Sequence, residues 1–233
     1  MKPKYTHIGN VVLVGTSHIA DEAVKNVKAV IEEFNPCIVG VELDKQRFRA
    51  LLSQQKSSYF PSINNIRRFG VKGTIFALIG GYVSDKLAKT VGAKPGDDML
   101  SALYTAREHD LTIALLDQPI HITLNRFSRY LTWKEKWNFL VDIIKGVLFP
   151  RRELKKYGLQ SLDLRKVPAK KLVKVMVNHV KERYPNVYRV LIAERNEYMV
   201  RKIHAFQKKY PGMIIVAVVG AGHEDGMNEL LQG

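Results

Sequence analysis

Four segments of the chain are almost continuously apolar. They are residues 11–14, 37–43, 111–116 and 213–219. Unbroken apolar runs of this length are typical of strands covered on both faces, as in parallel sheets, whereas strict alternation is typical of a sheet with one solvated face. The four segments therefore predict a mostly parallel central sheet in the interior of the protein.

Residues 19–34, between the first two strand-like runs, carry apolar side chains at helical spacing with charged side chains opposite. This periodicity predicts an amphipathic helix. Strand, helix and strand then form a βαβ unit, whose crossover is expected to be right-handed. The fold class is therefore α/β, a mostly parallel sheet flanked by helices.

Two long segments do not follow the strand pattern. Residues 60–95 contain the short apolar stretch GTIFALIGGYV, which is too short to span a bilayer and which we interpret as a helical hairpin or lid over the sheet edge. Residues 122–190 are helical by pattern, with breaks at Pro150 and Pro168. We predict a single domain over residues 1–233, with helical insertions at about 53–95 and 122–190.

Each apolar run is followed by a polar side chain. His18, Glu42, Asp117 and His223 come at or shortly after the ends of the four runs. Ligands of open α/β sheets bind outside the carboxyl ends of the strands. The pattern therefore predicts that these side chains lie at one edge of the sheet and form a functional site there.

The first and last runs both lead into Gly-x-x-His, as Gly15-Thr16-Ser17-His18 and as Gly220-Ala221-Gly222-His223. A glycine after a strand allows a sharp turn, and the histidine then lies at the start of the next helix. Two such histidines favour a shared functional site. The alternative is that each satisfies backbone groups at a helix N-terminus.

Glu42 is the natural third member of this site, because an unpaired carboxylate at the end of a buried strand would be costly. The alternative to this functional role is that Glu42 forms a structural ion pair with Arg47. Two neutral imidazoles and a carboxylate suit a divalent ion with open positions, which acidifies a bound water. Without a metal, a histidine could act as general base and Glu42 could orient it.

Two further segments carry candidate residues. Arg195 and Asn196 adjoin on a predicted helix, where such a pair holds a substrate carboxylate or an oxyanion, or is solvated surface. Asp97 and Asp98 follow Pro95-Gly96, which is typical of a helix N-terminus. Asp98 facing the site is the functional alternative.

Composition narrows the class of protein. Hydrophobic residues make up 46% of the 233 residues, which is enough for a core, and the single cysteine, Cys37, excludes a disulfide framework and a multi-cysteine metal site. No signal-peptide pattern and no apolar run of bilayer length are present. We expect a cytoplasmic protein that is soluble or peripheral to a membrane.

The net charge of +15 is unevenly placed. Between His121 and Val190 there are 17 lysines and arginines but only five acids, a net charge of +12. Trp133 and Trp137 lie one turn apart in this basic 122–190 segment, so their helix could lie on an anionic membrane surface or pack its apolar face on the core. Nucleic acid is a weaker candidate, because no recognised binding motif is present.

Six motifs in order, GTSH, VELDKQR, PGDDMLSALYTA, LLDQPIHITLNR, AERNEYM and VVGAGHEDGM, resemble the TraB/PrgY family, also called pheromone shutdown proteins, and its archaeal branch. The family is grouped with the Tiki metalloproteases and with the erythromycin esterase and ChaN-like folds. Its bacterial members are linked to limiting peptide pheromone activity. The resemblance covers nearly the whole chain and implies that the protein handles peptides.

By motif match, the resemblance implies that His18 and His223 are paired metal ligands with Glu42 as the acidic partner, and that Arg195 and Asn196 form a polar pair. Manganese or cobalt is the favoured ion, with zinc as the alternative. Two positions depart from the family pattern: Asp98 stands where glutamate is usual, and Gln118 follows Asp117 where arginine is usual.

These observations predict a metal-dependent hydrolase, most specifically a peptidase acting on a peptide or protein substrate. The alternative is a protein that binds and sequesters a peptide or small ligand without cleaving it. The two differ in one respect, since only the hydrolase releases product. The sequence leaves the oligomeric state open, and a homodimer is compatible with it.

Overall fold

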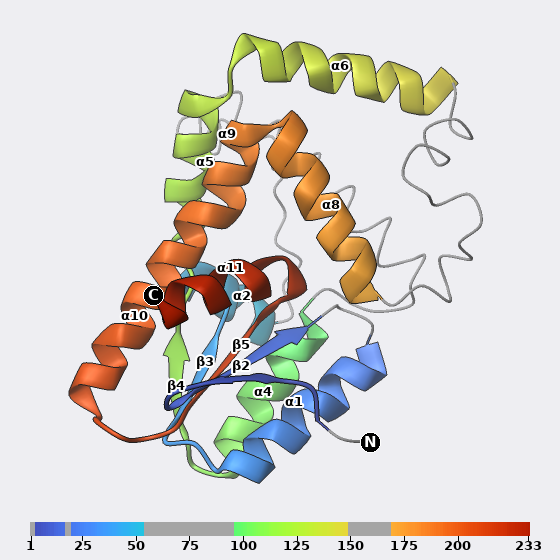
Figure 1. The fold of residues 1–233 in the computed structure, drawn as a ribbon. Coiled ribbons are helices and arrows are strands. Elements are labelled where there is room, and N and C mark those ends of the chain that lie inside the picture. The colour runs from blue at the N-terminus through green and yellow to red at the C-terminus, as the bar shows by residue number, and fades with distance from the viewer. Residues whose placement is uncertain (1–2, 17–19, 54–95, 149–168) are drawn as a thin grey trace.

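The computed structural model describes residues 3–16, 20–53, 96–148 and 169–233. These residues form an α/β fold around one five-stranded sheet of order β1-β2-β5-β3-β4 (Figure 1). The strands are β1 (Thr6–Ile8), β2 (Val11–Thr16), β3 (Ile38–Val41), β4 (Thr112–Leu115) and β5 (Ile215–Gly220). The four apolar runs of the sequence thus correspond to β2, β3, β4 and β5, which confirms the predicted fold class.

The sheet is parallel except at one edge. β5 pairs in parallel with β2 on one side and with β3 on the other, and β3 pairs in parallel with β4. β1 is antiparallel to β2 and was not predicted, because it has three residues and lacks a continuous apolar run. The parallel pairing places the carboxyl ends of four strands at one edge.

Helices cover both faces of the sheet, which explains why its strands lack alternation. Val12, Val14, Val216 and Val218 face one core cluster, shared with α1 (Ala20–Phe34) and α4 (Asp97–Glu108). Val11, Leu13, Ala217 and Val219 face the other, shared with α10 (Glu194–Lys209) and α11 (Ala221–Gln232). Successive residues of a strand point to opposite faces, and here both faces are dry.

A group of helices stands beyond the carboxyl ends of the strands (Figure 1). It comprises α5 (Ile120–Tyr130), α6 (Trp133–Leu148), α8 (Ala169–Arg183), α9 (Pro185–Tyr188) and the π-helical turn η1 (Arg189–Ala193), while α2 (Lys45–Leu52) follows β3. The helical pattern of residues 122–190 is thus observed where the structure describes it. The predicted lid at 60–95 and residues 149–168 lie outside the described ranges. Within those ranges, no helix is long and apolar enough to cross a bilayer.

Candidate functional site

Three neighbouring strands, β5, β3 and β4, bring polar groups together at their carboxyl ends. Glu42 directly follows β3 and its backbone N donates to Val218 O of β5 at 3.1 Å. Asp117 follows β4, and its backbone N donates to Leu43 O at 3.3 Å. The parallel ladder therefore continues past the strands and holds the two carboxylates side by side.

His223 lies in the first turn of α11, directly after β5, and is only 4% exposed. Its Nδ1 lies 2.6 Å from Oδ1 of Asn196 on α10, and its Nε2 lies 3.3 Å from Oε1 of Glu42. A carbonyl oxygen only accepts, so Nδ1 carries the hydrogen and donates it to Asn196. The other ring nitrogen, Nε2, is thereby directed toward Glu42.

Glu42 is buried, and both of its oxygens are engaged. Oε1 accepts from Arg195 Nη2, and Oε2 accepts from the backbone N of Gly220 at 2.7 Å. Burial alone would raise the pKa of Glu42, but the neighbouring His223 and Arg195 lower this pKa well below its usual range. Glu42 is therefore a carboxylate anion inside the protein.

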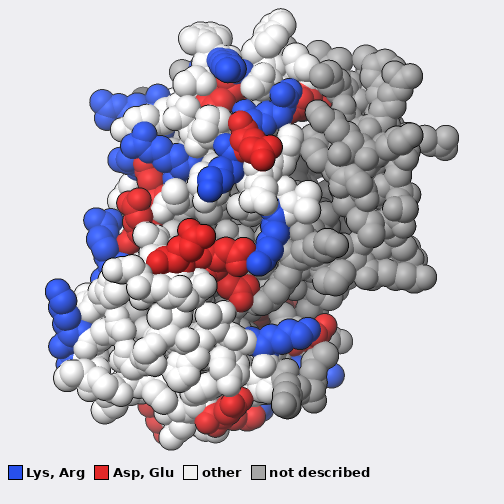
Figure 2. Space-filling view, viewed as in Figure 1, with Lys and Arg blue, Asp and Glu red and all other residues white. Residues whose placement is uncertain are grey.

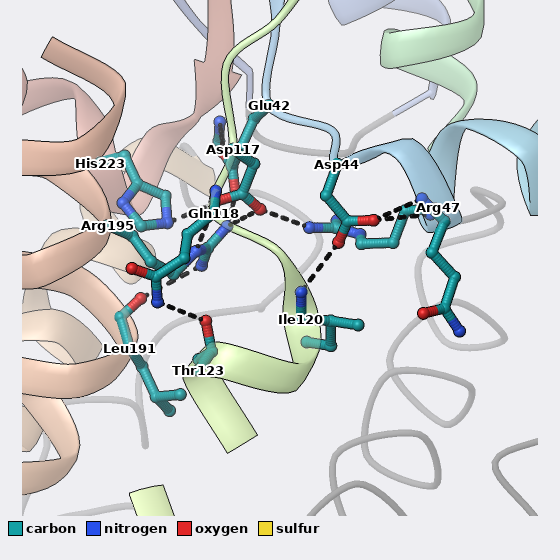
Figure 3. A network of polar contacts seen from close by, with 12 residues as sticks. Glu42, Asp44, Arg47, Asp117, Gln118, Ile120, Thr123, Leu191, Arg195 and His223 are labelled. Atoms are coloured by element: carbon teal, nitrogen blue, oxygen red, sulfur yellow. Dashed lines mark hydrogen bonds and ion pairs between the residues drawn. The ribbon is translucent and has the colours of Figure 1, made fainter. Parts of the chain in front are cut away.

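Arg195 links two carboxylates. Its Nε and Nη2 donate to the two oxygens of Asp117 at 2.9 and 2.8 Å, Nη2 also donates to Glu42, and Nη1 donates to Leu191 O at 3.1 Å. Burial opposes its charge, but Glu42 and Asp117 raise the pKa of Arg195. Figure 3 shows His223 and Arg195 on one side of Glu42 and Asp117, and Arg47 on the other.

The ion-pair partner of Arg47 differs from the one expected from the sequence. Its Nη1 donates to Asp117 Oδ2 at 2.8 Å, so Arg47 pairs with Asp117, whereas the ion pair of Glu42 is with Arg195. Asp117 had been identified as a polar residue at a strand end, but its role as the anchor of both arginines was missed. A carboxylate directly after the apolar run 111–116 was the available signal.

The loops that carry these residues are fixed by side-chain capping. Asp44 caps α2, because its Oδ1 accepts from the backbone N of Gln46 at 2.6 Å and of Arg47 at 3.0 Å. Its Oδ2 accepts from the backbone N of Ile120 at 3.1 Å, which ties the start of α5 to the same loop. Gln118, at the position that departs from the family pattern, donates to Thr123 Oγ1 at 3.0 Å.

Asp98 lies at the end of a different strand. It is buried in the first turn of α4, and its side chain accepts from Thr16 Oγ1 of β2 and from the backbone N of Met99 at 2.9 Å. β5 separates β2 from β3 in the sheet, so Asp98 is placed beside the neighbouring strand end. His18, the other member of the predicted histidine pair, lies outside the described residues.

Gly226 of α11 packs against Asn196 and was not identified from the sequence. A Cβ at position 226 would come within 3.0 Å of Asn196 Nδ2, a separation that real Cβ atoms essentially never show. The glycine therefore lets α10 approach α11 closely enough for Asn196 to reach His223. A glycine in the interior of a helix, which costs stability relative to alanine, was the available signal.

The model of the TraB/PrgY/gumN family matches residues 4–232 of the chain. The chain belongs to the TraB/PrgY/gumN family. The match covers all of the site elements described above, from β1 to α11, so the motif-based resemblance is confirmed at the level of the family.

Relatives of this TraB/PrgY/gumN chain occur in archaea and in mammals. An uncharacterized protein of Methanocaldococcus jannaschii is 28% identical over 225 residues, which cover 96% of this chain and 53% of that protein. TraB domain-containing proteins of Bos taurus and Homo sapiens are 26% and 24% identical, and each match covers 94% of this chain and 62% of the relative. The chain thus spans between half and two thirds of the length of these relatives.

Proposed function

We propose that this family member is a metal-dependent hydrolase that cleaves peptide bonds, with His223 at its centre. The observation that carries the proposal is the buried chain Asn196–His223–Glu42 at the carboxyl edge of the sheet. The peptide substrate follows from the resemblance to pheromone shutdown proteins and Tiki proteases.

The geometry around His223 fits a divalent ion. A neutral imidazole with Nδ1 bound to Asn196 directs a lone pair at Glu42, so two acceptor atoms face each other at 3.3 Å and require a cation between them, either a proton or a metal. Two ligands of a tetrahedral ion, each about 2.1 Å from it, lie about 3.4 Å apart. The second contact of the ring, to Asn196, matches the outer contact of metal-bound histidines.

Among the described residues, no group of three or more histidine, cysteine, aspartate or glutamate side chains is placed to hold a metal ion. His223 and Glu42 would be two ligands of the site, and His18, outside those residues, is the expected third. Manganese or cobalt is the expected ion, with zinc as the alternative. Such an ion would acidify a bound water and polarise the substrate carbonyl.

The protein's own residues have positioning roles in this scheme. Asn196 fixes the tautomer and the ring plane of His223. Arg195 keeps Glu42 ionised, which suits a ligand or an electrostatic anchor better than a proton acceptor, whose pKa should lie near the working pH. The net reaction adds water across the peptide C–N bond and delivers a proton to the departing amine.

The geometry favours such positioning roles for Arg195 and Asn196 over direct contact with the substrate. Arg195 donates from all three of its nitrogens to Asp117, Glu42 and Leu191 O, and Asn196 Oδ1 accepts from His223. An oxyanion role, predicted from the sequence, would require at least one of these contacts to be exchanged for the substrate.

Cleavage of an unstructured peptide library, read by mass spectrometry, tests the proposal. Metal-stripped protein receives manganese, cobalt or zinc, alongside His223→Ala and a matched control, His109→Ala, at an exposed position after α4. We expect metal-restored cleavage that His223→Ala loses and His109→Ala keeps. Cleavage that survives in His223→Ala would contradict the assignment of the site.

A second candidate is a peptide-binding protein without turnover. The observation that favours it is that Glu42 and Arg195 are already committed to each other, so the site is saturated by its own ion pairs. Intact library peptides that remain on the protein under every ion, with no product formed, would establish this candidate and exclude the hydrolase.

A further inference from the structure

Helix α6 presents two tryptophans to solvent. Trp133 is 83% exposed and Trp137 is 66% exposed, the largest exposed fractions among the large hydrophobic residues of the described part of the chain. The sequence left open whether these rings pack on the core, and the structure shows that they do not. Isolated exposed apolar residues need no explanation, but two large rings one helical turn apart do.

The opposite side of α6 is anchored to the rest of the protein. Glu135 accepts from the backbone N of Asn186 at 2.7 Å, and Asp142 accepts from Arg183 Nε and Tyr184 Oη, each at 2.5 Å. Asn138 donates to Arg183 O at 3.4 Å. At about 100° per residue, positions 135, 138 and 142 share one side of the helix.

The same rotation fixes the outward direction of the tryptophans. Positions 133 and 137 lie about 170° and about 130° away from the centre of the anchored side, with Lys134 and Lys136 on either flank. Lys134 is exposed, and Lys136 Nζ lies 4.1 Å from the centre of the Trp133 ring. Two aromatic rings with a lysine on each side therefore form the exposed face of this turn, named here the α6 face.

Lys134 and Lys136 give the α6 face a positive charge. The two acids of the first three turns, Glu135 and Asp142, are used in the anchored contacts. Figure 2 shows lysine and arginine side chains at the upper end of the molecule, where α6 lies in Figure 1, together with acidic and uncharged ones. The 122–190 segment adds to this field, with its net charge of +12 between His121 and Val190.

We infer that the α6 face docks the protein on the surface of an anionic lipid bilayer. Tryptophan rings settle at the headgroup level of a membrane, and lysines beside them attract anionic lipids. A second copy of the chain is a poorer occupant, because a symmetric contact would bring the lysines of both copies together. Docking is peripheral, and it is independent of the proposed hydrolase site, which lies at the edge of the sheet.

The two tryptophans of the chain are Trp133 and Trp137, so intrinsic fluorescence reports on the α6 face alone. Full-length protein is mixed with vesicles of phosphatidylcholine containing phosphatidylglycerol, and with vesicles of phosphatidylcholine alone. We expect co-sedimentation and a blue shift of the emission with the anionic vesicles, both weakened by added salt, and quenching by brominated lipid.

Substitutions test whether vesicle binding depends on the α6 face or on another surface of the protein. Trp133→Ala combined with Trp137→Ala should lower partitioning into anionic vesicles by about tenfold or more, with an unchanged circular dichroism spectrum. The matched control is Tyr104→Ala, at a 53% exposed aromatic position on α4, far from α6 in Figure 1. This variant should bind vesicles like the wild type.

Three results would overturn the inference. The first is the absence of a blue shift or of co-sedimentation with anionic vesicles. The second is vesicle binding that the double variant retains, which would place the contact elsewhere. The third is a blue shift produced by raising the protein concentration, or by a single-stranded oligonucleotide, without any response to vesicles.

Discussion

At the residue scale, the site is a balanced group of charges around one buried histidine. Two carboxylates, Glu42 and Asp117, face two guanidinium groups, Arg47 and Arg195. The two pairs of charges compensate one another, and Nε2 of His223 lies 3.3 Å from Glu42 Oε1. A buried pair of this kind is costly to break, since the remaining partner is left uncompensated.

Glu42→Gln should therefore destabilise the protein by about 3 kcal/mol at neutral pH. The pKa of Glu42 in the folded state lies below its ordinary value of 4.5, so its stabilising effect is complete above about pH 4.5 and is lost as the pH falls through the folded-state pKa. We expect the difference in unfolding free energy between wild type and variant to shrink in acid.

Urea unfolding followed by circular dichroism over a pH series measures this difference. Glu229→Gln, at an exposed position of α11, is the control and should show a small effect at every pH. A wild-type advantage over Glu42→Gln that is constant down to strong acid would mean that Glu42 is not held as an anion by Arg195 and His223.

At the element scale, α10 and α11 together orient the ring of His223. α10 begins directly after the π-helical turn η1, and π-turns are common at functional sites. Asn196 comes from the first turn of α10 and His223 from the first turn of α11, and Gly226 makes their close approach sterically feasible. We therefore expect the spacing between the two helices to control the His223 tautomer.

Two alanine substitutions on α11 test this dependence. Alanine normally favours a helix over glycine by about 1 kcal/mol. At Gly222 an added Cβ meets Val177 Cγ2 at an ordinary 3.5 Å, so Gly222→Ala should retain or slightly raise stability. At Gly226 it would displace Asn196, so Gly226→Ala should break the contact with His223.

The readout is the 15N spectrum of the histidine rings, which distinguishes a hydrogen on Nδ1 from one on Nε2. Wild type and Gly222→Ala should show one histidine held with its hydrogen on Nδ1, and Gly226→Ala should lose this signal while remaining folded. Library cleavage should fall in parallel. An unchanged ring spectrum in Gly226→Ala would show that Asn196 does not set the tautomer.

At the scale of the whole molecule, the sheet is enclosed on both faces and its carboxyl edge is covered by helices (Figure 1). The layer containing α10 and α11 supplies Arg195, Asn196 and His223 to the site and packs on one of the two core clusters. Met199, Ile203 and Met227 of these helices are fully buried against the sheet. Stability and site geometry therefore depend on the same layer.

A pair of methionine substitutions measures how much the packing of this layer contributes to the free energy of unfolding. Met199→Ala, at a fully buried position of α10, should cost about 2–5 kcal/mol, because it leaves a cavity. Met176→Ala, at a 51% exposed position of α8, should change stability by about 0.5 kcal/mol or less. Denaturant unfolding checks both values, and equal effects would contradict the burial of α10 against the sheet.

Much of the fold is determined by the sequence alone. Continuous apolar runs predict β2 to β5, helical periodicity predicts α1, and polar residues after the runs predict a site at the carboxyl edge. These signals are local, because the spacing of apolar residues in a strand or helix follows from backbone geometry. The position of the site follows from parallel pairing, which places the carboxyl ends of the strands at one edge. Glu42 and His223 meet at this edge as predicted, and Asn196 joins them.

Only the tertiary structure decides which groups pair. Arg195 and Glu42 are 153 residues apart in the chain, and their contact depends on how α10 crosses the end of the sheet. The same holds for Arg47 with Asp117, for Gly226 against Asn196, and for the outward direction of Trp133. An apolar or charged position has the same local pattern whichever partner it meets, so the choice of partner is made by the packing of distant elements.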